Sequence, residues 1–203
     1  MQAFNKLKIS NIILIEIYYI IISIKSVYTN GEFLDMKQLT LSDSSYFVIL
    51  DTGLYLYELS DLKFFKIFEF DNELKETNKK INLTELYDED NAYMFCLVNE
   101  YLFLFNEYTN KINYYKINEV EGFNNYYYNL MPYKIENNNI SFFIAFNNDT
   151  SNLYFYFYNF KVDESINKPI LIKFSEMNIQ NKMIRCQINS NSIFIICFYY
   201  SKV

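Results

Sequence analysis

One segment of the chain combines residue types and spacing that are suited to acid–base chemistry. It is Ile49-Leu50-Asp51-Thr52-Gly53-Leu54, in which an Asp-Thr-Gly triplet follows an apolar run. A carboxylate in such a loop acts as an acid or a base when it shares one proton with a second carboxylate nearby. The chain has no second Asp-Thr-Gly or Asp-Ser-Gly triplet. Catalysis by Asp51 would therefore need a homodimer that brings two copies of this side chain together.

The triplet resembles the catalytic loop of aspartic proteases. The resemblance implies that Asp51 is a catalytic acid in a homodimeric enzyme of the retroviral type. The chain departs from that family at Leu54, where the family usually has a small Ala or Ser. The alternative interpretation is a three-residue hairpin loop with Gly53 at positive φ. We favour the loop, and we predict that the chain is not an enzyme.

Composition excludes several other kinds of chemistry. The chain has no His, so His-dependent nucleophilic catalysis and His metal ligands are excluded. Its 3 Gly are spread along the chain and form no nucleotide-binding loop. With 18 basic and 24 acidic side chains the net charge is −6, and the chain has no block of basic residues, so we do not expect it to bind nucleic acid.

The acidic cluster Asp88-Glu89-Asp90 lacks the spaced ligands and the glycine of a calcium-binding loop. We therefore expect this segment to be a solvated loop, and we expect the chain to bind no metal and no cofactor.

The three cysteines are Cys96, Cys186 and Cys197. Cys186 and Cys197 flank a segment rich in Asn and Ser, which predicts a hairpin turn. If Asn189 pairs with Ser192, the two thiols are diagonal neighbours on one side of the hairpin. A register two residues different would set them directly opposite, where a disulfide can form. A disulfide and two buried free thiols both remain open.

Sequons for asparagine glycosylation occur at Asn82, Asn139 and Asn148. In a chain as rich in Asn as this one, such triplets also arise by chance. They are glycosylation candidates only if the chain is secreted.

Residues 1–29 differ from the rest of the chain. Lys6 and Lys8 form a short basic start, a nearly continuous apolar run extends from Ile9 to Ile24, and turn-forming residues follow. This order is typical of a secretory signal peptide. An uncleaved membrane anchor and a buried element of an intracellular protein are the alternatives, because Glu16 interrupts the run and the run is shorter than the span of a membrane helix.

Aliphatic and aromatic residues alternate in four runs, which predicts strands with one side chain type on each face. The runs are Leu54–Tyr57, Leu102–Phe105, Leu153–Tyr158 and Ile193–Ile196. Each run follows another expected strand and a polar turn; these preceding strands are Tyr46–Leu50, Tyr93–Val98, Ser141–Phe146 and Met183–Ile188. The first two runs are also followed by a further strand, Phe64–Phe70 and Ile112–Val120.

Antiparallel units that recur every ~40–50 residues are typical of propeller blades. Residues 45–203 resemble β-propeller repeat proteins in general, in pattern only, without the Trp of a WD or kelch signature. The resemblance implies an all-β fold of antiparallel propeller-like blades in residues 30–203, after an apolar helix at the amino terminus. A meander sandwich or barrel and a mixed α+β fold are the alternatives. Asn82–Asn91 is a candidate for a short helix.

The repeats amount to two full units, a third whose outer strand is unclear and half of a fourth. Because a propeller usually needs at least four complete blades, we expect an incomplete propeller, and the chain to be the amino-terminal part of a longer protein or a truncated copy.

These observations favour a secreted or surface-exposed β-repeat protein that binds a protein partner through loops and Tyr-rich faces, among them Tyr126-Tyr127-Tyr128. Contact with a membrane is expected only through residues 1–29, if they are not cleaved. The alternatives are the Asp51 protease and an intracellular β scaffold. The sequence does not identify the partner.

Overall fold

In the computed structural model of the chain, every element of the described part is a β-strand. The described residues are 32–72, 74, 80–87, 90–117, 128–136, 138–147, 153–162, 164, 169–174, 182–189 and 194–201. The predicted signal peptide, membrane anchor or apolar helix in residues 1–29 lies outside this set. The chain divides into two units, residues 1–75 and residues 76–203.

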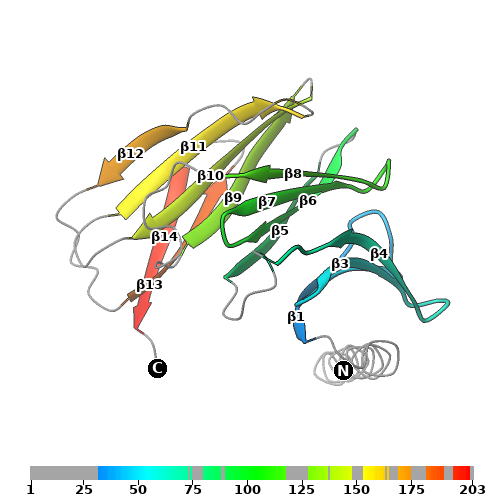
Figure 1. The fold of residues 1–203 in the computed structure, drawn as a ribbon. Coiled ribbons are helices and arrows are strands. Elements are labelled where there is room, and N and C mark those ends of the chain that lie inside the picture. Colours follow the sequence, from blue (N-terminus) through cyan, green and yellow to red (C-terminus); the bar gives the residue numbers. More distant parts are fainter. Residues whose placement is uncertain are drawn as a thin grey trace, which may run out of the picture. The chain divides into compact units, whose positions relative to one another are not determined.

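The first unit contains one antiparallel sheet of four strands in the order β1-β2-β3-β4 (Figure 1). The strands are β1 Phe33–Gln38, β2 Ser45–Leu50, β3 Gly53–Glu58 and β4 Lys63–Glu69. Strands β2 and β3 are almost wholly buried, whereas β1 and β4 at the edges are half-buried or exposed. Val48, Leu50, Tyr55 and Tyr57 form a buried cluster on one side of this sheet.

The second unit contains three sheets, and in each of them every strand pairs antiparallel with the next strand of the sequence (Figure 1). The second sheet comprises β5 Ile81–Tyr87, β6 Ala92–Val98, β7 Tyr101–Asn106 and β8 Lys111–Lys116. The third sheet comprises β9 Tyr128–Glu136, β10 Asn139–Asn147, β11 Leu153–Lys161 and β12 Ile170–Phe174. The fourth sheet comprises β13 Lys182–Asn189 and β14 Phe194–Ser201.

Within the second unit the first strands of successive sheets lie next to one another. Strand β9 contacts both β5 and β13. Four-stranded meanders whose first strands adjoin in this way have the arrangement of propeller blades. The structure therefore confirms the prediction of an all-β fold with propeller-like blades.

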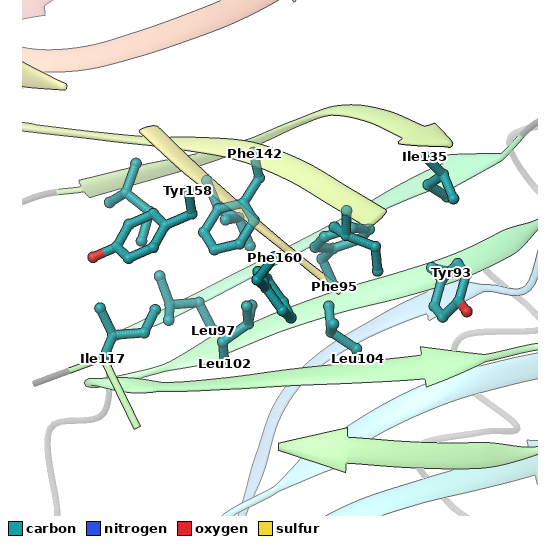
Figure 2. Packing of buried hydrophobic residues seen from close by; sticks show 13 residues of the cluster. Tyr93, Phe95, Leu97, Leu102, Leu104, Ile117, Ile135, Phe142, Tyr158 and Phe160 are labelled. Atoms are coloured by element: carbon teal, nitrogen blue, oxygen red, sulfur yellow. The ribbon is translucent and has the colours of Figure 1, made fainter. Parts of the chain in front are cut away.

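A core of aliphatic and aromatic side chains fills the space between the second and third sheets (Figure 2). Phe142 is fully buried at its centre, stacked on Tyr158 with ring centroids 4.8 Å apart and perpendicular to Phe160 at 6.0 Å. The second sheet contributes Phe95, whose ring lies 6.3 Å from that of Phe142. Burial of one such ring contributes roughly 1.5–3 kcal/mol to stability, so this core holds the two sheets together.

Residues 81–87 correct one expectation. The short helix predicted at Asn82–Asn91 is wrong, because Ile81–Tyr87 form strand β5, which pairs along its whole length with β6. Strand β6 is buried at every residue and needs a hydrogen-bonded neighbour on each side. Tertiary pairing thus overrides the weak local helix preference of this segment.

The fourth aromatic–aliphatic run also occupies an unexpected place. It forms β14, the partner of β13, and β13 adjoins β9, the first strand of the third sheet. Strand β13 therefore takes the first position of the fourth sheet and β14 the second. The earlier runs form third strands, which explains the shorter interval before the fourth run. The expectation of half a fourth unit agrees with the two strands described there.

Candidate interaction surface

Asp51 and Thr52 form a two-residue hairpin loop, because Leu50 pairs directly with Gly53. The loop is thus one residue shorter than expected, since Gly53 belongs to β3. The Asp51 side chain accepts a hydrogen bond from the Glu32 backbone amide at 2.9 Å, and the Asp51 amide donates to the Glu32 carbonyl at 2.9 Å. Asp51 therefore ties the chain just before β1 to the β2–β3 loop.

Gly53 has a positive φ of 159°, which agrees with the expectation for this residue. A Cβ at this position would collide with the backbone carbonyl oxygen of Phe68 in β4. The glycine is therefore required by the close approach of β3 and β4, a structural role that is independent of catalysis.

The second sheet repeats the Asp51 contact with a residue that cannot be an acid. Asn99 accepts a hydrogen bond from the Lys80 amide at 3.0 Å and donates its own amide to the Lys80 carbonyl at 2.9 Å. Both contacts join residues 19 apart in the sequence, between the start of a sheet and its first tight turn. This equivalence supports the interpretation of Asp51 as a turn residue. The protease hypothesis, which needs a second copy of the chain, stays untested.

The acidic cluster lies mostly outside the described part of the chain. Asp88 and Glu89 lie outside the described residues, and Asp90 is exposed. Among the residues that the structure describes, no three Cys, Asp or Glu side chains converge in a way that would hold a metal ion.

The glycosylation candidates differ in their positions. Asn139 is exposed at the start of β10, directly after the β9–β10 turn. Asn82 is half-buried in β5, which lies between β6 and β9. Asn148 lies outside the described residues. Of the two described candidates, Asn139 has more room for a glycan.

The cysteine register differs from the one expected from an Asn189–Ser192 pair. Asn189 pairs with Phe194, so the backbone of Cys186 lies directly opposite that of Cys197. The hairpin loop is two residues longer than expected, and loop length sets the register of a hairpin. This is the register that a cross-strand disulfide needs, and the disulfide itself stays a prediction. Cys96 is a buried free thiol in β6.

Several tyrosines of the predicted Tyr-rich faces are buried in the core. Tyr55, Tyr57 and Tyr158 are buried, because their strands are covered on both sides. Tyr128 begins β9, and Tyr126 and Tyr127 lie outside the described residues. The expectation that outward Tyr rows form the contact surface is therefore wrong for these three buried tyrosines.

Strand β12 carries the longest consecutive stretch of exposed large apolar residues in the described part of the chain. Ile170, Leu171 and Ile172 have 63%, 50% and 41% of their surface exposed. The segment reads Ile-Leu-Ile-Lys-Phe, with one charged residue. Sequence reasoning missed it, because the outer strand of the third repeat has no recognisable tight turn before it. The available signal was this short β-branched and aliphatic run.

Other outer strands carry more charge than β12. Strand β4 contains Lys63, Lys66 and Glu69, and β8 begins and ends with Lys111 and Lys116. Charged residues on an edge strand oppose the pairing of that edge with other chains. Strand β12 has weaker protection of this kind.

Pairing in the third sheet places Ile170 and Ile172 on the same side as aromatic residues of β11. Ile170 lies opposite Phe157, and Ile172 lies opposite Phe155. The Phe157 ring is 4.7 Å from that of Phe143 in β10. Phe143 and Phe155 are buried, Phe157 is half-buried, and the two isoleucines are exposed. We call the side formed by Phe157, Ile170 and Ile172 the β11–β12 face; Leu171 lies on the opposite side of β12.

Two lysines of the second and third sheets contact groups of their own sheet. Lys116 lies 3.1 Å from the Glu100 carboxylate and over the Tyr101 ring, with its Nζ 5.2 Å from the ring centroid. Hydrogen bonding to Tyr101 and then to Glu100 raises the pKa of Lys116 above its ordinary value. Lys173 of β12 lies over the Tyr154 ring at 5.6 Å. Because Lys173 and Leu171 share one side of the strand, the β11–β12 face itself carries no charge.

No described residue belongs to a helix that is long and apolar enough to cross a membrane.

The described sheets define an all-β protein built from propeller-like blades. No family model matches the chain, and no curated protein matches it. Among solved structures, the chain is similar to the WD40 domain of SCAP from fission yeast, with 11% identity and a TM-score of 0.41. The match covers 86% of this chain and 43% of that one, so this chain spans less than half the length of the matched structure.

Proposed function

We propose that the chain is a protein-interaction module whose docking surface is the β11–β12 face. The observation that carries the proposal is the exposure of Ile170 and Ile172 on one side of an edge strand, next to the half-buried Phe157. Contiguous exposed apolar residues mark protein interaction sites, whereas single exposed ones are ordinary. The face continues directly from buried aromatic residues, so a partner that covers it extends an existing apolar core.

Photocrosslinking tests the proposal. A benzophenone side chain is introduced at Ile172, and the variant is irradiated in extract of the native cells. We expect a discrete protein adduct, because Ile172 is an exposed residue of this face. Folded protein that gives no adduct at this position would contradict the proposal.

Strand β12 supplies its own matched control. Ile170→Lys places a charge on the β11–β12 face, and Leu171→Lys places one on the opposite side of the same strand. We expect the adduct yield from Ile172 to fall about tenfold with Ile170→Lys, as for loss of a central contact residue, and to change little with Leu171→Lys. Both substitutions are at exposed positions, so both variants are expected to fold.

We also propose that residues 1–29 direct the chain into the secretory pathway. The support is the order of basic start, apolar run and turn residues in this segment. Amino-terminal sequencing of the native protein tests it: cleavage near Ser26 or Thr29 is expected, and an intact Met1 in soluble cytosol would contradict it.

A further inference from the structure

Tyr87 is the most exposed of the tyrosines whose side chains the structure describes, with 63% of its surface accessible. It is the last residue of β5 and lies opposite Ala92, the first residue of β6. Only residues 88–91 connect the two strands. The Tyr87 phenol is therefore exposed beside the loop of a hairpin, where the active site of another protein can reach it.

Acidic residues surround Tyr87 in the sequence. Asp88, Glu89 and Asp90 follow it directly, and Glu85 precedes it by two positions. Glu85 lies on the same side of β5 as Tyr87, because side chains alternate along a strand. Asp90 is exposed. No Lys or Arg occurs within five positions of Tyr87, so its segment carries four acidic side chains and no basic one.

Two other tyrosines of the described part are exposed, and both lie in segments of different charge. Tyr108 and Tyr114 have 51% and 56% of their surface accessible. Within five positions, Tyr108 has one acidic and one basic neighbour, and Tyr114 has one acidic and two basic neighbours. Exposure alone therefore does not distinguish these three tyrosines, whereas local charge sets Tyr87 apart.

We propose that Tyr87 is a modification site that carries an anionic ester, either sulfate or phosphate, on its phenol oxygen. The donor is an activated anhydride, which is nucleotide-linked sulfate in one case and a nucleoside triphosphate in the other. The phenol oxygen forms a bond to the sulfur or phosphorus of the donor, and the anhydride bond breaks. The nucleotide leaves with the electron pair of that bond, and the phenol proton passes to a base of the transferase.

The acidic segment explains why a transferase would select Tyr87. Both donors are polyanions, so the cleft that binds them is positively charged. A cleft lined by one sign of charge attracts ligands of the opposite sign and raises their association rate by about 10-fold or more. The segment around Tyr87 is attracted to such a cleft, whereas the net positive segment around Tyr114 is not.

Mass spectrometry of the native chain tests this inference. The chain is purified from its own cells and digested, and its peptides are fragmented to locate each ester. We expect the esterified fraction of Tyr87 to exceed that of Tyr108 and Tyr114 by about tenfold or more. A native chain in which Tyr87 is recovered only as free tyrosine would overturn the inference.

Phosphatase treatment identifies the ester. A phosphate is removed from Tyr87 by the enzyme, and a sulfate resists it. Either ester supports the modification site. A sulfate agrees with the secretory proposal for residues 1–29, whereas a phosphate counts against that proposal and leaves the site intact. Because the site is independent of the β11–β12 face, failure of the crosslinking experiment does not affect it.

Variants expressed in the native cells separate the acceptor from its acidic neighbours. Tyr87→Phe keeps the ring and removes the acceptor oxygen, so we expect a folded chain without the ester, and Tyr108→Phe is the matched control that keeps it. Combined Asp88→Asn, Glu89→Gln and Asp90→Asn substitutions retain Tyr87 and are expected to lower its esterified fraction about tenfold. A neutralised chain esterified as fully as the parent would overturn selection by charge.

Discussion

The Asp51 side chain accepts a hydrogen bond from the backbone amide of Glu32 at 2.9 Å. In the second sheet, Asn99 accepts the equivalent bond from Lys80 at 3.0 Å. Each contact connects the start of a sheet to its first tight turn. Because an amide oxygen and a carboxylate oxygen serve equally as acceptors here, the contact needs an acceptor and no ionisable group.

Substitutions at Asp51 distinguish a turn residue from a catalytic acid. Asp51→Ala is expected to lower the free energy of unfolding by about 1 kcal/mol, through loss of one side-chain hydrogen bond. Asp51→Asn is expected to retain stability, and Asn99→Ala is the matched variant in the second sheet. Urea unfolding measures all three. Loss of a peptidase activity in folded Asp51→Asn protein would instead support the protease.

Leu62 has an unfavourable backbone conformation that a single substitution relieves. Its φ is 53° in the β3–β4 turn, where Cβ crowds the following carbonyl oxygen. The β7–β8 turn has Asn110 with φ of 52° at the corresponding place. We expect Leu62→Asn to raise the free energy of unfolding by up to about 1 kcal/mol, measured by urea unfolding.

Two variants control for loss of the Leu62 side chain. Leu62→Ala keeps the Cβ and is expected to bring no comparable gain. Asn110→Leu is expected to destabilise by about the amount that Leu62→Asn stabilises. A stability gain with Leu62→Ala equal to that of Leu62→Asn would show that backbone strain is not the cause.

Glycosylation is expected at Asn139 in preference to Asn82. A glycan must remain in solvent after folding; Asn139 is exposed beside a turn, whereas Asn82 is half-buried in a strand with neighbours on both sides. The chain is expressed through a eukaryotic secretory pathway and treated with a glycosidase. Glycosidase treatment is expected to lower the mass of the parent chain and of Asn82→Gln, and to leave the mass of Asn139→Gln unchanged. The reverse pattern would contradict the prediction.

Cys186 and Cys197 are expected to form a cross-strand disulfide under oxidising conditions. Directly opposite residues of antiparallel strands have Cα atoms about 4.5–5.5 Å apart, within the range of disulfides. Alkylation of the denatured chain without reductant should modify one of the 3 cysteines, Cys96. After reduction all three should react. Modification of all three before reduction would show that the bond is absent.

Sequence periodicity predicted the second and third strands of the first three sheets and the fourth strands β4 and β8, and it missed the first strands β5 and β9 and the fourth strand β12. Runs such as Leu54–Tyr57 and Leu102–Phe105 alternate because both sides of their strands pack against other residues, and that alternation is visible locally. Strand β12 has only five residues and no tight turn before it, so no local feature marked it. Strand β9 contains Pro132, which lies next to a register shift in its pairing with β10, a place where a sheet tolerates proline. Periodicity alone does not predict a strand there.

The candidate surface was largely beyond the reach of the sequence. The tyrosines selected as a contact surface include Tyr55 and Tyr57, which are buried because their strands are covered on both sides. The exposed residues are aliphatic ones, Ile170 and Ile172, whose type predicts a core. Exposure depends on which neighbouring strands are present, and composition does not contain that information.

The amino-acid sequence by itself determined the β class, the positions of the tight turns and the period of the repeats, because each of these depends on residues a few positions apart. The tertiary structure alone decided which strand takes which place in a sheet, the register of β13 and β14, and the side of the third sheet that stays exposed. These features depend on hydrogen bonds and packing between residues distant in the chain, whose free energy exceeds the local preference of any one segment.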